Sequence, residues 1–160
     1  MRQFDINLKS LINSSPVVIF LCKLTGNWPV ELITENVQQF GYETEDFISG
    51  SIQFLDIVYP EDRKRVNEEI TRYSKKGVDK IIQEYRILTA SGQIRWVEVK
   101  ALIRMDENGN VSHYQGTLCD ATNQKKIEES MQETLKEKNE LRNIIKSSPV
   151  FVFLCKHVQK

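Results

Sequence analysis

The spacing of apolar residues at the N-terminus predicts a helix followed by a β-hairpin. Four apolar residues recur at helical spacing: Phe4, Leu8, Leu11 and Ile12. They predict an amphipathic helix over residues 1–13, which Pro16 ends because the residue before a proline avoids the α region. Residues 17–23 and 28–34 are apolar and short, so we expect two strands joined by a turn at Gly26.

The apolar pattern then changes from strand-like to helical. Asn36 is expected to cap a one-turn helix, with Gln39 as its reciprocal partner three residues later. Thr44 begins another short helix, with carboxylates in its first turn. Pro60 occupies the first position of a longer helix, which lysines and Gly77 close.

Three further strands are predicted at residues 80–88, 94–105 and 111–119, with turn residues between them. Alternation in the middle strand puts one set of apolar residues on a single face: Val97, Val99, Ala101, Ile103 and Met105. Two strands, short helices and then an antiparallel meander predict an α+β domain. Its five-stranded antiparallel sheet carries the short helices on one face.

Residues 123–146 contain no glycine or proline and are rich in charge, which predicts a linker helix of roughly 36 Å. Four apolar residues fit positions a and d of one heptad register: Ile127, Met131, Leu141 and Ile145. Thr134 and Lys138 occupy the same register between them. The pattern fits a weakly pairing helix and a solvated linker helix with one packing stripe equally well.

An internal repeat gives the domain organisation. The segment Leu8–Lys23 recurs, with mostly conservative substitutions, as Leu141–Lys156. Self-similarity at a domain-sized spacing indicates tandem domains and not a solenoid. We therefore expect one domain over residues 14–122 and the start of a second, truncated copy over residues 147–160.

Composition narrows the classes of function. The net charge is zero, which argues against a nucleic-acid-binding protein. The three cysteines form no disulfide framework and no zinc motif, which is typical of a reduced, cytoplasmic protein. The longest apolar run is far shorter than the ~20 residues that a membrane span needs, so no span is expected.

The order of several short motifs resembles the PAS domain with its C-terminal PAC motif. They are Asn36, Phe40-Gly41-Tyr42, Tyr59-Pro60-Glu61-Asp62, Glu84-Tyr85-Arg86, Gly92, Arg95-Trp96-Val97, Gly116 and Asp120-Ala121-Thr122. The resemblance implies a pocket between the helices and the inner face of the sheet. It also implies that Asp120 and Thr122 couple the last strand to the outgoing helix. This chain departs from the family at Tyr59, where histidine is frequent, and at Ala121, where isoleucine is.

Tandem PAS units joined by a charged helix look like the input half of a sensor histidine kinase. The resemblance implies a downstream PAS or kinase domain as partner in a two-component phosphorelay. The chain itself has no glycine-rich ATP-binding motif, and neither His113 nor His157 lies in a helical phospho-acceptor context. We therefore expect a sensory module and not an enzyme.

The resemblance also implies what the pocket holds. Haem-binding members commonly use a histidine on the long helix, and none occurs between Pro60 and Asp79. Flavin-binding light sensors carry an Asn-Cys-Arg-like helix start, where this chain has Val37-Gln38-Gln39. We expect neither cofactor, but a pocket that is filled by side chains or that takes a small ligand. Candidate lining residues, which would otherwise be ordinary core, are Phe40, Phe54, Ile57, Val97, Val99 and Ile103.

Three functions remain as hypotheses. The first is a signalling module that passes a pocket or partner signal to the linker helix. The second is a ligand-free scaffolding module, a homodimer that pairs through its terminal helices. The third is a thiol sensor that uses Cys22 or Cys119, which the lack of a neighbouring general base disfavours.

Overall fold

The computed structural model describes residues 8–149, so Phe4 and most of the second copy lie outside the described residues. Two strands, a run of helices and three further strands precede one long helix. In chain order the elements are α1 (Leu8–Ser14), β1 (Val18–Lys23), β2 (Val30–Ile33), η1 (Glu35–Phe40), α2 (Thr44–Ile48), α3 (Phe54–Ile57), α4 (Pro60–Lys75), β3 (Lys80–Leu88), β4 (Ile94–Met105), β5 (Val111–Asp120) and α5 (Thr122–Ser147). The predicted strands are confirmed. Helix α3 was not predicted from the apolar pattern.

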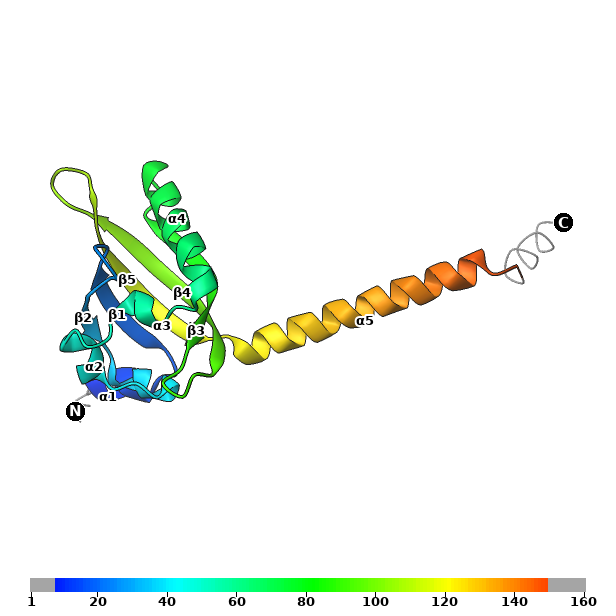
Figure 1. Ribbon diagram of the computed structural model, residues 1–160, viewed down its shortest axis with the longest axis horizontal. Helices are drawn as coiled ribbons and strands as arrows, with labels where there is room; N and C mark the ends of the chain where they lie inside the picture. Colours follow the sequence, from blue (N-terminus) through cyan, green and yellow to red (C-terminus); the bar gives the residue numbers. More distant parts are fainter. Residues whose placement is uncertain (1–7, 150–160) are drawn as a thin grey trace, which may run out of the picture. The chain divides into compact units, whose positions relative to one another are not determined.

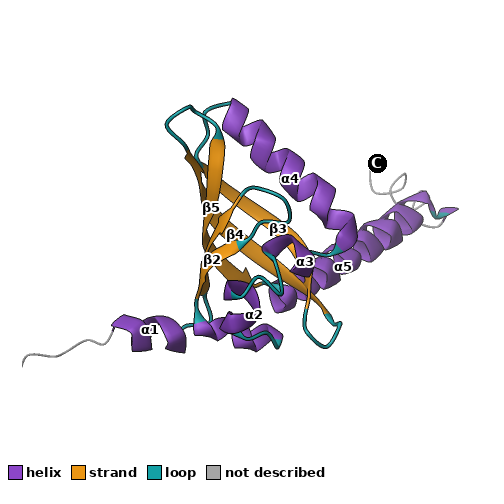
Figure 2. Cartoon of the chain, turned by 60° about the vertical axis from the view of Figure 1, so that its left-hand side comes forward, coloured by secondary structure: helices purple, strands orange, loops and turns teal. Residues whose placement is uncertain are grey.

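The five strands form one antiparallel sheet in the order β2-β1-β5-β4-β3. The last strand, β5, is therefore central, between β1 from the start of the chain and β4 (Figure 1). Helices α2, α3 and α4 lie over one face of this sheet (Figure 2). The α+β fold class is confirmed.

The inner face of β4 follows the predicted alternation except at its end. Val97, Val99, Ala101 and Ile103 are all buried. Met105 was expected on the same face, but it is 45% exposed. The reason is an irregularity in the pairing of β4 with β5 between Arg104 and Met105, which breaks the period of two.

The expectation that Asn36 caps a helix is wrong. The 3₁₀-helix η1 begins at Glu35, after Thr34, and Asn36 lies inside it. The Asn36 side-chain amide instead donates hydrogen bonds to three backbone carbonyls at the end of α1 and the entry to β1, those of Ile12, Ser15 and Val17. Carbonyls at a helix end lack partners within the helix, and Asn36 supplies the missing donors. It therefore fastens α1 to the domain.

The contacts divide the chain into two compact units, with the boundary between Thr122 and Asn123. The first unit contains the sheet and its core, and the second contains α5 beyond its first residue. Among the helices between residues 8 and 149, none is both long and apolar enough to span a membrane.

Candidate functional site

Four aromatic rings fill the space between α3 and the inner face of the sheet. Phe54 of α3 lies with its ring centroid 4.6 Å from that of Phe20 on β1. Tyr114 of β5 is 5.3 Å from Phe20 and 5.6 Å from Trp28, measured between ring centroids. Trp28 was predicted to begin the second strand, but it lies before β2. Its φ is 63° and its side chain is buried. The centre of the domain is thus a packed aromatic cluster.

All six residues predicted to line a pocket lie in this core. Phe40 ends η1, Phe54 and Ile57 lie on α3, and the remaining three lie on β4. None is more than 3% exposed, and all belong to one apolar cluster. The structure therefore brings them together, in the close-packed arrangement of core side chains.

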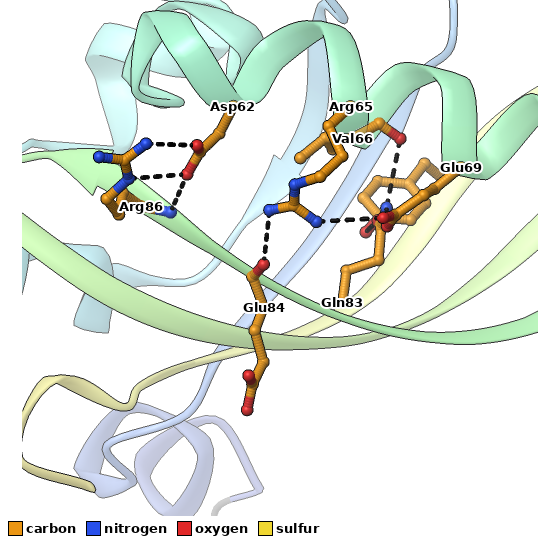
Figure 3. Close-up of polar contacts among 8 residues, drawn as sticks. Asp62, Arg65, Val66, Glu69, Gln83, Glu84 and Arg86 are labelled. Atoms are coloured by element: carbon orange, nitrogen blue, oxygen red, sulfur yellow. Dashed lines mark hydrogen bonds and ion pairs between the residues drawn. The ribbon is translucent and has the colours of Figure 1, made fainter. Parts of the chain in front are cut away.

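A seam of polar side chains joins α4 to β3, and Figure 3 shows its contacts. At one end, the buried Asp62 carboxylate on α4 accepts three hydrogen bonds from Arg86 on β3. The backbone N–H is 2.8 Å away, Nε 3.1 Å and Nη2 2.7 Å. These bonds hold the pKa of Asp62 below its ordinary value, although burial acts in the opposite direction. Asp62 is therefore ionised at neutral pH, and it fixes the start of α4 on the sheet.

At the other end of the seam, hydrogen bonds connect the core to the surface of α4. The Tyr114 hydroxyl donates to Oε1 of Gln83 at 2.8 Å. The Gln83 amide donates to the Glu69 carboxylate at 2.9 Å and to the carbonyl of Val66 at 3.2 Å. Arg65 then bonds to Glu69 at 3.1 Å (Figure 3). Burial raises the pKa of Tyr114, which keeps its hydroxyl protonated as a donor.

The Tyr85 hydroxyl is a buried polar group without a satisfied hydrogen bond. It lies in the core near Tyr114, but among the described residues no acceptor stands in hydrogen-bond geometry to it. Burial raises the pKa of Tyr85 well above its ordinary value, so the hydroxyl keeps its proton. An unsatisfied buried donor costs about 1–3 kcal/mol. The Tyr85 hydroxyl is therefore a poorly paired donor beside Tyr114 in the core.

The junction between β5 and α5 is hydrogen-bonded to β4. The N–H of Ala121 donates to the carbonyl of Trp96 on β4 at 2.8 Å. The Thr122 hydroxyl accepts the N–H of Trp96 at 3.0 Å. The Asp120 carboxylate accepts the N–H of Thr122 at 2.8 Å and lies 3.6 Å from Arg95. The Asp120 carboxylate thus satisfies the first N–H of α5, while the Thr122 hydroxyl bonds to β4 and not to its own helix.

Arg86 connects the seam to this junction. It lies directly opposite Trp96 in the pairing of β3 with β4. Its guanidinium carbon is 5.9 Å from the Trp96 ring centroid and 4.3 Å from that of Tyr59. Both distances suit attraction between a cation and the face of an aromatic ring. Arg86 therefore contacts both Asp62, which holds α4, and Trp96, whose backbone bonds to Thr122 at the start of α5.

The four residues predicted on the linker helix all lie on α5, and all are exposed. Their exposed fractions are 61% for Ile127, 61% for Met131, 58% for Leu141 and 48% for Ile145. Leu135 and Ile144, which the heptad pattern did not include, are exposed as well. The apolar face of α5 is thus broader than predicted.

Neither cysteine of the described residues is placed for thiol chemistry. The Cys22 thiol is buried and faces the carbonyl of Tyr114 at 3.5 Å, and burial raises its pKa. Burial also raises the pKa of Cys119, and the nearby Glu98 adds to the effect. His113 lies on β5, with Nε2 3.3 Å from Glu31. Residues 8–149 hold no group of three or more His, Cys, Asp or Glu side chains that could bind a metal ion.

Sequence reasoning missed Gln83, and it noted Arg86 only as part of a motif. The signal for Gln83 was present, because it shares the apolar face of β3 with Ile81, Tyr85 and Ile87. A polar residue on the buried face of a strand needs a hydrogen-bond partner. The role of Arg86 depends on its cross-strand partner, which the sequence does not state.

The chain belongs to the PAS fold family, whose sequence model matches residues 32–118. Among curated proteins it is 42% identical over 122 residues to a methyl sulfide methyltransferase-associated sensor of Methanosarcina acetivorans. It is 28% identical over 96 residues to the sensor protein FixL of Bradyrhizobium diazoefficiens. These matches cover 76% and 60% of this chain but only 12% and 18% of the two relatives. The chain thus corresponds to a small part of each.

Solved structures show the same fold. A sensory box histidine kinase/response regulator from Burkholderia thailandensis matches with a TM-score of 0.62 and 18% identity, covering 82% of this chain and 97% of that one. A PAS domain from Colwellia psychrerythraea matches with a TM-score of 0.59 and 20% identity, covering 71% and 93%. The resemblance noted in the sequence is confirmed at the level of the family and the fold.

Proposed function

We propose that this chain is the sensory input module of a larger signalling protein, in which a change at the core or at α4 is passed to α5. One observation carries the proposal: Arg86 contacts both Asp62, which holds α4, and Trp96, which holds α5. The relatives that are named sensors support the same role.

The strands and helix α4 are held in the domain by different kinds of contact. The four strand pairs are joined by ladders of backbone hydrogen bonds. Helix α4 instead meets β3 through a few side-chain hydrogen bonds and the buried Val66 and Ile70. A ligand or partner that moves α4 changes the position of Asp62, and Arg86 must follow it or lose its charged partner. The distance between Arg86 and the Trp96 ring then changes, and the Trp96 backbone is bonded to Thr122 at the start of α5.

The output in this proposal is a partner domain after α5, either a second PAS domain or the kinase domain of a sensor histidine kinase. The chain contributes sensing and no catalytic group. Its one histidine among residues 8–149, His113, lies on a strand beside Glu31, and its two thiols there are held protonated. A ligand-free dimerisation module is the second candidate, which the filled aromatic core and the exposed apolar face of α5 favour.

We also propose that the core binds neither haem nor flavin, and that any ligand is small. The aromatic rings around Phe54 occupy the space over the sheet, and the Tyr85 hydroxyl beside Tyr114 is a poorly paired donor that a small ligand could engage. The purified chain is expected to show only tyrosine and tryptophan absorbance, with a native mass equal to the chain or to the chain plus a small molecule. Absorbance near 400 nm or 450 nm that co-purifies with the chain would contradict this.

The proposal predicts that Thr122→Val loosens the start of α5. The substitution keeps the shape of the side chain but removes the hydroxyl that bonds to the Trp96 backbone. We expect a loss of about 1–2 kcal/mol in the free energy of unfolding. Amide hydrogen exchange should become faster at Trp96 and in the first turn of α5.

Two control variants separate the bond from the side chain. Thr122→Ser retains the hydroxyl and should restore slow exchange. Thr117→Val makes the same chemical change on the outer face of β5 and should leave exchange in α5 as it is. If Thr122→Val and Thr117→Val have equal effects on α5, the junction does not hold the helix.

A further inference from the structure

A cleft of about 330 Å³ lies between the C-terminal half of α4 and the hairpin that joins β4 to β5. Both elements lie at the same end of the sheet (Figure 1). The volume is that of about ten molecules of liquid water, so the cleft accommodates a ligand of about ten heavy atoms. None of the four clustered aromatic residues lines it. The lining residues are Leu24, Asn67, Ile70, Thr71, Ser74, Lys75, Gly109, Asn110 and Val111.

Three apolar side chains form one part of this lining. Ile70 of α4 is buried in the core, and Leu24 and Val111 pack partly buried against the same core. The N–H of Leu24 donates to the carbonyl of Ser112 on β5 at 2.9 Å, which fixes the segment after β1 beside the hairpin. The apolar part of the cleft is therefore continuous with the core of the domain and suits a short alkyl chain.

The hairpin side of the cleft is held in place by its own hydrogen bonds. The Asp106 carboxylate accepts the N–H groups of Asn108 and Asn110, each at 2.9 Å. Gly109 has φ 77°, and a Cβ atom there would meet nothing within 4 Å, so this wall leaves the cleft open. The two walls are thus already formed without a ligand, which is typical of small-molecule sites.

Helix α4 supplies the polar part of the lining from one of its faces. Asn67, Thr71, Ser74 and Lys75 share this face with Ile70, because three or four residues separate neighbours along it. The Thr71 hydroxyl donates to the carbonyl of Asn67 at 3.1 Å, so it faces the cleft only as an acceptor. Within residues 8–149 the side chains of Asn67, Ser74 and Lys75 form no hydrogen bond or ion pair. They are the groups that remain to bind a ligand.

Charge decides which ligand the cleft suits. Of the described residues that line it, Lys75 alone carries a charge, and no carboxylate pairs with it. Arg72 lies in the same last turn of α4, and the two cations offset the negative end of the helix dipole. An ammonium group next to the Ser74 hydroxyl offers charge-assisted hydrogen bonds to a carboxylate.

We propose that this cleft binds a small carboxylate with a short apolar chain. Lys75 and Ser74 bind the carboxylate group, the chain lies against the apolar lining, and Asn67 takes a polar group where the ligand has one. This inference rests on the proposed function, since a ligand that joins α4 to the hairpin acts on the helix from which the signal starts.

The test is an NMR titration of the whole chain with hexanoate and with hexanamide, its uncharged isostere. Hexanoate should shift the amides of residues 71–75 and 109–111 in a saturable way, with a dissociation constant in the millimolar range. Hexanamide should bind about tenfold more weakly or less, because it forms no charge-assisted bond to Lys75. Equal affinities, or no saturable shift at these amides with hexanoate, would overturn the proposal.

Two lysine variants separate this site from general attraction of an anion. Lys75→Met should weaken hexanoate binding about tenfold. Lys76→Met removes the same charge one residue later, where the side chain does not line the cleft, and should leave binding unchanged. Both lysines are exposed, and circular dichroism shows that each variant is folded. Equal weakening by the two variants would overturn the site.

The same titration distinguishes the site from the proposed function. Coupling of α4 to α5 predicts that bound hexanoate also shifts the amides of residues 123–128. Saturable shifts at the cleft alone would support the site and contradict the coupling. Failure of hexanoate to bind would overturn the site and leave the effect of Thr122→Val on hydrogen exchange, and with it the proposed function, untouched.

Discussion

Replacing Gly116 by alanine is expected to destabilise the domain by about 3 kcal/mol or more, because the new methyl group would collide with backbone atoms. Gly116 lies on the central strand β5, opposite Ala101 of β4 and Phe20 of β1. A Cβ atom at this position would lie 2.1 Å from the carbonyl oxygen of Lys100 and 2.7 Å from the Cα of Ala101. The strands must separate to accommodate it, since no side-chain rotation relieves the clash. Chemical denaturation measures the loss.

Gly50→Ala is the matched control for this prediction. Gly50 has φ 80°, and a Cβ atom there would meet nothing within 4 Å. Alanine at Gly50 therefore carries only the cost of left-handed backbone, about 1–2 kcal/mol. A smaller loss for Gly116→Ala than for Gly50→Ala would show that β4 and β5 do not approach each other as described.

Asp62→Ala is expected to cost about 3 kcal/mol, the second largest effect. The substitution removes the acceptor of three hydrogen bonds from Arg86 and leaves that guanidinium partly buried without its main partner. Glu61→Ala is the matched control, because Glu61 also contacts Arg86, at 3.2 Å, but is 72% exposed in its side chain. We expect it to cost no more than about 1 kcal/mol. Comparable losses for the two variants would contradict the assignment of Asp62 as the residue that anchors α4.

The Asp62 contribution also depends on pH. The pKa of Asp62 is lower in the folded domain than in the unfolded chain, mainly because the carboxylate accepts hydrogen bonds from Arg86. Its stabilising effect is therefore fully present above the unfolded value of about 3.9 and is lost as the pH falls through the folded value. Wild type and Asp62→Asn should differ most at neutral pH and converge in acid. Parallel pH profiles of the two proteins would exclude this linkage.

Much of the fold followed from local patterns because three of the four strand pairs are formed by strands adjacent in the chain. Turn residues around residues 80–88 and the alternation in residues 94–105 predicted β3 and β4 at the residues observed. The predictions for Asn36 and Met105 were wrong because each residue depends on contacts that have no local signature in the sequence. Asn36 donates to carbonyls more than 18 residues away, and Met105 follows an irregularity in the pairing of β4 with β5.

The candidate site was predictable only in part. Burial of Val97, Val99 and Ile103 followed from the same alternation that predicted β4, whereas Phe40, Phe54 and Ile57 lie on short helices where no such alternation applies. The Tyr114–Gln83–Glu69 contacts depend on how α4 crosses β3, and the Arg86–Trp96 contact depends on the register of a hairpin. Asp120 and Thr122 were identified through the family resemblance, but the bond from Thr122 to β4 appears only in three dimensions.

The central claim is that α4 and α5 are coupled through Arg86 and Trp96. The most direct measurement is the change in amide chemical shifts at Asn123–Glu128, the start of α5, when Asp62 is replaced by asparagine. We expect clear shifts at these amides in the wild-type background and much smaller shifts when Thr122→Val is also present. Shifts confined to α4 and β3, or equal shifts in both backgrounds, would contradict the coupling.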